Sequence, residues 1–166
     1  MGASMNSKRV SMNWATILAV MLVVCTGVRA GSGASDEPIT EVLAKYGLPI
    51  GLLPDSVKSY SLADDGEFKV ELEKPCYVQF NCLVYYDDKI TGKLTYGKIS
   101  DLDGIKVRKF FIWVNIKGIE VDVPSSDFIY FKVGIISKKI EISWFESVPT
   151  CKDSLGNEPC NDVQTA

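Results

Sequence analysis

The sequence predicts an all-β domain with one N-terminal helix, arranged as a small, strongly coiled antiparallel β-barrel with the helix packed on it. From residue 57 onward, apolar and polar residues alternate in short runs, as in strands with one buried face. Turn residues separate these runs at intervals of about 8–12 residues, which is typical of barrels and sandwiches. Segment 104–123 changes the phase of its alternation twice, which predicts bulges that coil the strand.

The helix is expected directly after residue 36. Asp36 can cap it, Pro38 suits its first turn, and Gly47 ends it. Its apolar stripe has helical spacing and consists of Ile39, Val42, Leu43 and Tyr46. The connector 47–54 is apolar and contains prolines, so we expect it to pack against the sheet.

The strands follow as short alternating runs. Segments 58–62 and 67–73 form a hairpin across an Asp-Gly turn. Further strands are predicted at 76–86, 90–98, 129–136 and 139–145, with turns at 87–88 and 137–138.

The stretch KFFIWVNI, residues 109–116, is apolar at five consecutive positions. If Phe110 and Ile112 face the core, Phe111 and Trp113 lie on the outer face, because successive strand residues point to opposite sides. We expect the helix and the connector 48–53 to cover them. The alternative is that a ligand or a partner covers them.

The chain is expected to divide into four parts: a signal peptide (1–30), a flexible leader (31–36), a single helix-plus-barrel domain (37–150) and a polar tail (151–166). Lys8 and Arg9 precede a short apolar run, and the exit at Ala30 or Ala34 resembles a cleavage site. The run is short for a membrane anchor, which is the alternative. The sequence thus predicts a secreted protein of the extracellular space or the cell-wall region, without a transmembrane segment after cleavage.

The net charge of the chain limits the classes of binding partner that we expect. Cleavage at residue 30 removes three of the 18 basic residues and none of the 21 acidic ones, leaving 15 against 21 and a net charge of −6. This balance excludes a typical nucleic-acid-binding protein and disfavours simple electrostatic docking on anionic lipid. We expect a monomer.

Four cysteines remain after cleavage: Cys76, Cys82, Cys151 and Cys160. We predict a Cys151–Cys160 disulfide across a polar loop. A Cys76–Cys82 bond is not expected, because a continuous strand would hold the two about 20 Å apart. The alternative for that pair is two free buried thiols.

Most catalytic chemistry is missing from the sequence. The chain has no histidine, which removes histidine-activated nucleophiles and ordinary zinc sites. It has no phosphate-binding glycine loop and no nucleophile elbow. Segment 101–104 faintly resembles a calcium loop, but a turn is favoured. We therefore predict no cofactor, no metal and no catalytic residue.

The aromatic residues suggest a binding role. They can fill the core, line a cavity for a lipid, sterol or pigment, or form a platform for polysaccharide. The candidate surface for an apolar ligand or partner consists of Phe111, Trp113, Tyr85 and Tyr96.

An ordered series of motifs resembles the plant family catalogued as domain of unknown function 538. It includes YGLPIGLLP (46–54), EKPC (73–76), ITGKLTYGKIS (90–100), VRKFFIWV (107–114) and FESVPTC (145–151). The resemblance implies a small secreted β-barrel with a helix, likened to lipid-binding barrels of the bactericidal/permeability-increasing type. Pigment binding has also been proposed for the family, and the resemblance carries over no catalytic residue.

The prediction for function is a non-catalytic secreted binding module for an apolar ligand or a lipid surface. One alternative is a pigment- or carbohydrate-active hydrolase. Another is a cell-wall or protein-interaction domain, which would show a flat, exposed aromatic strip. An enclosed interior of about 300 Å³ or more would favour a bound ligand.

Overall fold

The computed structural model describes residues 37–109, 111–124 and 126–154. The predicted signal peptide and leader lie outside the described residues, as do Phe110, Cys160 and residues 155–166 of the predicted tail.

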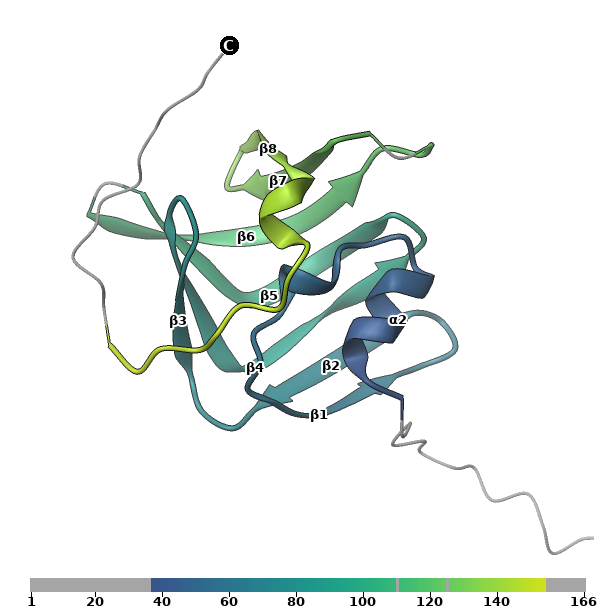
Figure 1. Ribbon diagram of the computed structural model, residues 1–166, viewed down its shortest axis with the longest axis horizontal. Helices are drawn as coiled ribbons and strands as arrows, with labels where there is room; N and C mark the ends of the chain where they lie inside the picture. Colours follow the sequence, from purple (N-terminus) through teal and green to yellow (C-terminus); the bar gives the residue numbers. More distant parts are fainter. Residues whose placement is uncertain (1–36, 110, 125, 155–166) are drawn as a thin grey trace, which may run out of the picture. The chain divides into compact units, whose positions relative to one another are not determined.

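One antiparallel sheet dominates the described part of the chain (Figure 1). Its strands are β1 (Val57–Leu62), β2 (Glu67–Leu72), β3 (Cys76–Gln79), β4 (Leu83–Thr95), β5 (Lys98–Lys109), β6 (Ile112–Val121), β7 (Phe128–Val133) and β8 (Ile136–Glu141). Their order is β1-β2-β4-β5-β6-β7-β8, and β3 pairs with β4 beyond the end of the β2 ladder. The prediction of mostly antiparallel β structure with one short helix is confirmed.

A closed barrel is not confirmed. The sheet is open, because no ladder joins β1 to β8 among the described residues. Helical segments pack on its inner face instead: α2 (Ile39–Lys45), η1 (Ile50–Leu52) and η2 (Ile142–Phe145) (Figure 1). These segments bury the apolar side chains that barrel closure would otherwise have to bury.

The helix and the connector pack as predicted, but against the inner face only. Val42, Leu43, Leu48, Leu52 and Leu53 are all buried in the core. The connector passes so close to η2 that a Cβ on Gly51 would lie 2.6 Å from the backbone oxygen of Phe145, the last residue of η2.

Near β4, one turn was not predicted and another was misplaced. Residues 76–86 form a hairpin and not a continuous strand, since Cys76 pairs with Tyr86. The predicted turn at 87–88 lies inside β4, where the register of the β4–β5 ladder shifts between Tyr86 and Thr91. The shift lets the strand continue past two acids, and Asp87 forms an ion pair with Lys106 of β5.

The two phase changes in segment 104–123 have different causes. The first is a hairpin turn, because Lys109 pairs with Ile112. The second is the predicted bulge, seen as a register shift between Ile116 and Gly118. A two-residue turn and a bulge both displace the alternation, so the pattern alone did not distinguish them.

The last hairpin turns earlier than predicted. Val133 pairs with Ile136, and Gly134 adopts a φ of 62°, a conformation that glycine tolerates in tight hairpin turns. Residues 142–145 form η2 where a strand was expected.

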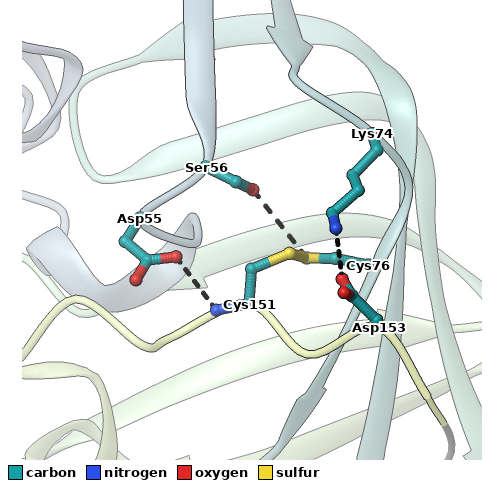
Figure 2. The surroundings of a disulfide bond; sticks show 6 residues. All are labelled: Asp55, Ser56, Lys74, Cys76, Cys151 and Asp153. Atoms are coloured by element: carbon teal, nitrogen blue, oxygen red, sulfur yellow. Dashed lines mark hydrogen bonds and ion pairs between the residues drawn. A yellow bond between two sulfur atoms is a disulfide. The ribbon is translucent and has the colours of Figure 1, made fainter.

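The predicted Cys151–Cys160 disulfide is wrong, because Cys151 is bonded to Cys76 (Figure 2). Two backbone hydrogen bonds between Tyr77 and Lys152 bring the chain beside β3, and the Cys151 N–H donates to Asp55 Oδ1 at 2.9 Å. The Cα atoms of Cys76 and Cys151 then lie 5.6 Å apart, within the normal disulfide range.

The other cysteine expectations can also be judged. A Cys76–Cys82 bond is absent, as predicted, because Cys76 bonds Cys151. Cys82 is itself disulfide-bonded, so the alternative of free thiols at these two positions is wrong.

Candidate functional site

The interior of the domain is filled. The inner face encloses a void of only about 20 Å³ lined by aliphatic and aromatic side chains, which is close to the space needed for one water molecule. Pockets that take small organic ligands are typically about 300–1,000 Å³. The described interior therefore offers no room for a lipid, sterol or pigment.

The outer face of the sheet carries a row of side chains that crosses four strands. The register aligns Tyr77 of β3 with Tyr85 of β4, Tyr85 with Lys106 of β5, and Lys106 with Asn115 of β6. Trp113 lies two residues before Asn115 and therefore on the same face. Together these five residues line an open hollow of about 330 Å³, which we call the aromatic pocket.

The three rings of the aromatic pocket contact one another at inclined angles. The ring centroids of Tyr77 and Tyr85 are 5.1 Å apart, and the Trp113 ring lies 6.1 Å from the first and 5.9 Å from the second. The interplanar angles are 44–62°. Such contacts stabilise the cluster, yet Trp113 remains 40% exposed.

One cation and one carboxylate complete the surroundings of the rings. The Lys106 ammonium lies 3.1 Å from Asp87 Oδ2 and 5.4 Å from the centroid of the Tyr85 ring. Burial, and then the neighbouring Asp87 carboxylate, raise the pKa of Tyr85, so its hydroxyl stays protonated at neutral pH. Arg108 lies opposite Trp113 in the β5–β6 ladder.

The structure brings together only part of the predicted surface. Trp113 and Tyr85 are in contact. Phe111 lies at the β5–β6 turn and is 90% exposed. Tyr96 lies beyond the opposite end of β4, beside Gly47. The expectation that the helix and connector cover Phe111 and Trp113 is therefore wrong.

Three members of the pocket were missed in the sequence: Tyr77, Lys106 and Asn115. A hairpin turn near residue 81 would have placed Tyr77 opposite Tyr85. Because 76–86 was interpreted as one continuous strand, the pairing of Tyr77 with Tyr85 was not predicted.

A second surface lies at the same end of the sheet. The β5–β6 turn exposes Phe111 and Ile112, and the β7–β8 turn exposes Ile135 and Ile136; we call these four residues the apolar tips. Ile135 is fully exposed and Phe111 nearly so. The second turn lies beside β6, since a Cβ on Gly134 would be 3.8 Å from a methyl group of Val114.

The hairpins behind the apolar tips are basic. Segments 105–119 and 128–140 contain seven lysines and arginines and no acid. Three of the seven pair with acids outside these segments. The bases nearest the turns are Arg108, Lys109, Lys138 and Lys139. The tip end therefore combines apolar turns with a positive border, in a chain whose overall charge is negative.

No group of metal-ligating side chains occurs within residues 37–154 where they are described. None of the helices in this part of the chain is long and apolar enough to cross a membrane.

Comparison with known proteins places this fold in a family. Residues 39–146 match the family described as protein of unknown function, DUF538. A protein of Arabidopsis thaliana, uncharacterized protein At5g01610, is 30% identical over 106 residues, which cover 62% of this chain and 60% of that protein. The chain thus spans less than two thirds of the length of the relative it matches. The match extends from α2 through η2, and the chain belongs to the DUF538 family.

Proposed function

We propose that this chain is a secreted, non-catalytic binding module that docks on an anionic lipid surface through its apolar tips. The observation that carries the proposal is the exposure of Phe111, Ile112, Ile135 and Ile136 at two turns whose flanking segments, 105–119 and 128–140, contain seven bases and no acid. Apolar turns surrounded by basic residues suit a membrane surface, where the turns can enter the acyl chains and the bases can contact the anionic headgroups.

The magnitudes favour association. Full burial of a side chain such as Phe or Ile contributes roughly 1.5–3 kcal/mol, and the four apolar tips need only partial burial. Each Lys or Arg near an anionic leaflet adds about 1 kcal/mol. Both contributions are present at one end of the same sheet.

The net charge of −6 is compatible with such docking. Electrostatic interactions in physiological salt decay over about 8 Å, so the leaflet interacts with the nearest charges and not with the total. The hairpin segments 105–119 and 128–140 are positive although the whole chain is acidic. The local distribution of charge, and not the net charge, therefore governs attraction to an anionic leaflet.

Other roles have less support. A ligand enclosed by the sheet would need more space than the void of about 20 Å³. A flat platform for polysaccharide would need coplanar rings, whereas those of Tyr77, Tyr85 and Trp113 are inclined to one another. The Cys76–Cys151 disulfide is compatible with an oxidising compartment, which supports the secreted location.

Vesicle co-sedimentation tests the proposal. The full chain is expressed through a secretory host and mixed with vesicles of phosphatidylcholine containing phosphatidylglycerol. We expect Phe111→Asp and Ile135→Asp each to weaken sedimentation at least tenfold. Each change removes an apolar side chain that would enter the membrane, and it adds a negative charge that the anionic surface repels.

The matched control is Val123→Asp, because Val123 is 67% exposed and follows β6 at its far end. This variant should bind as the parent does. Tip variants that fold normally by circular dichroism and still sediment like the parent would overturn lipid docking.

A further inference from the structure

Building on the proposed lipid docking, we propose that the aromatic pocket binds the phosphocholine headgroup of a membrane lipid. The ring faces of Tyr77, Tyr85 and Trp113 receive the quaternary ammonium, and Lys106 receives the phosphate.

The pocket is placed at headgroup depth. Trp113 follows the tip residue Ile112 directly, and Asn115 is four residues from Phe111. At about 3.3 Å per residue, the pocket begins roughly 7 Å behind the tip and ends roughly 13 Å behind it. The headgroup layer is about 5–8 Å thick on each side of the hydrocarbon core. Tips inserted roughly 5 Å beyond the acyl boundary, within the usual range for interfacial apolar residues, would bring the pocket among the headgroups.

The aromatic side of the pocket favours a weakly hydrated cation. Quaternary ammonium groups bind on the faces of Trp and Tyr, which carry partial negative charge. This property is already used in the structure, because the Lys106 ammonium lies 5.4 Å from the Tyr85 ring centroid. The Asp87 carboxylate, 3.1 Å from that ammonium, holds Lys106 at this edge of the pocket.

The cationic side of the pocket selects a zwitterion. A simple ammonium ion would be repelled by Lys106, and a simple phosphate would leave the ring faces without a partner. Phosphocholine carries both groups in one small unit, so each meets the side chain of complementary character. The hollow of about 330 Å³ is at the small end of ligand sites, which suits a headgroup and not a whole lipid.

The test compares vesicles that differ only in the headgroup methyl groups. Two sets contain the same fraction of phosphatidylglycerol, with either phosphatidylcholine or phosphatidylethanolamine as the remaining lipid. We expect the parent to bind the choline vesicles roughly 2- to 30-fold more tightly, the range that corresponds to one cation–π contact. Tyr85→Leu and Trp113→Leu should remove this preference and leave binding to ethanolamine vesicles unchanged.

Tyr96→Leu is the matched control, because Tyr96 is an exposed tyrosine at the opposite end of β4, and it should keep the preference. Equal binding of the parent to both vesicle sets would overturn phosphocholine recognition while leaving lipid docking intact. A parent that binds neither set would overturn the docking.

A vesicle-free titration examines the pocket by itself. In a background with Trp14→Phe and Trp144→Phe, which leaves Trp113 as the remaining tryptophan, Trp113 fluorescence is followed as phosphocholine, choline or inorganic phosphate is added. Phosphocholine should shift the emission at concentrations where the other two do not, and Lys106→Gln should weaken the response. No response to phosphocholine, or an equal response to choline, would overturn the inferred roles of the rings and Lys106.

Discussion

Tyr85 and Tyr86 are neighbours in β4, yet they lie on opposite faces of the sheet. Tyr86 faces inward, is 3% exposed and donates a hydrogen bond to the backbone oxygen of Leu52 at 3.1 Å. Tyr85 faces outward and contacts Tyr77 and Trp113 beside an open hollow. The inner face is covered by α2, η1 and η2, whereas the outer aromatic face has no such layer among the described residues.

The two faces both carry aromatic residues. The difference in their roles comes from the helical segments that pack on one face and not on the other. Inward side chains contribute to folding because water is excluded around them. Outward rings at a hollow keep surface available for another molecule. Four changes, taken from the largest expected effect to the smallest, test this division.

Loss of the disulfide should have the largest effect, because it holds segment 149–152 against β3 at the edge of the covered face. The bond closes a loop with a sequence separation of 75, for which chain entropy predicts a stabilisation of about 4 kcal/mol. The double variant Cys76→Ser and Cys151→Ser should lose that amount in urea unfolding. The parent in reducing buffer, which also breaks the disulfide of Cys82, should lose at least as much. A loss below about 1 kcal/mol in the double variant would contradict the structural role of the bond.

An inner-face cavity should come next. Leu102 is 1% exposed within the core cluster, so Leu102→Ala should cost about 3 kcal/mol in unfolding free energy. Urea unfolding measures the loss. Vesicle binding, measured below the unfolding transition, should stay at the level of the parent. A folded Leu102→Ala protein with weakened lipid binding would mean that the two faces are not independent.

The two tyrosines should respond differently to alkali. Burial raises the pKa of Tyr86 far above the ordinary tyrosine value of about 10. The protonated form is therefore favoured by folding, and its contribution is complete below pH 10 and is lost as pH rises beyond it. Tyr86→Phe should cost about 1–2 kcal/mol at pH 7, through the lost hydrogen bond to Leu52, but should fall less steeply above pH 10.

Tyr85→Phe provides the comparison for that measurement. Its pKa is also raised, by burial and by Asp87, but the ring is only partly covered. Urea unfolding of both variants between pH 8 and 11 should show the larger change of slope for Tyr86. The reverse order would place the covered face on the wrong side of β4.

The smallest effect on folding is expected at Trp113. It is 40% exposed and makes inclined ring contacts with Tyr77 and Tyr85, so Trp113→Ala should cost about 1 kcal/mol. This replaces the larger loss expected if α2 covered the ring. A cost of 3 kcal/mol or more in urea unfolding would show that Trp113 belongs to the folding core.

Particular residues show how far the sequence predicts this molecule. The stripe of Val42 and Leu43 predicted α2, and the alternation of Val70 and Leu72 predicted the inward face of β2. The Asp-Gly turn before β2 was also predicted, and Gly66 there has a φ of 89°. For the candidate site, Trp113 and Tyr85 were named, but Tyr77, Lys106 and Asn115 were not.

The sequence by itself determined the strand-rich class, the helix, the bulge near Gly118 and the motifs of the family. These depend on residue types and on a local period, which neighbours along the chain establish.

Only the tertiary structure decided that the chain turns at residues 80–82 and again between Lys109 and Ile112, that Cys151 bonds Cys76, and that the sheet stays open. It also decided that α2 covers the inner face and not Trp113. The alternation of apolar and polar residues shows that a strand has a buried face and an exposed face. The segment that packs on the buried face comes from far along the chain, so the alternation does not identify it. Contacts between residues as distant as Leu52 and Tyr86 depend on the whole set of pairings and leave no periodic trace in the sequence.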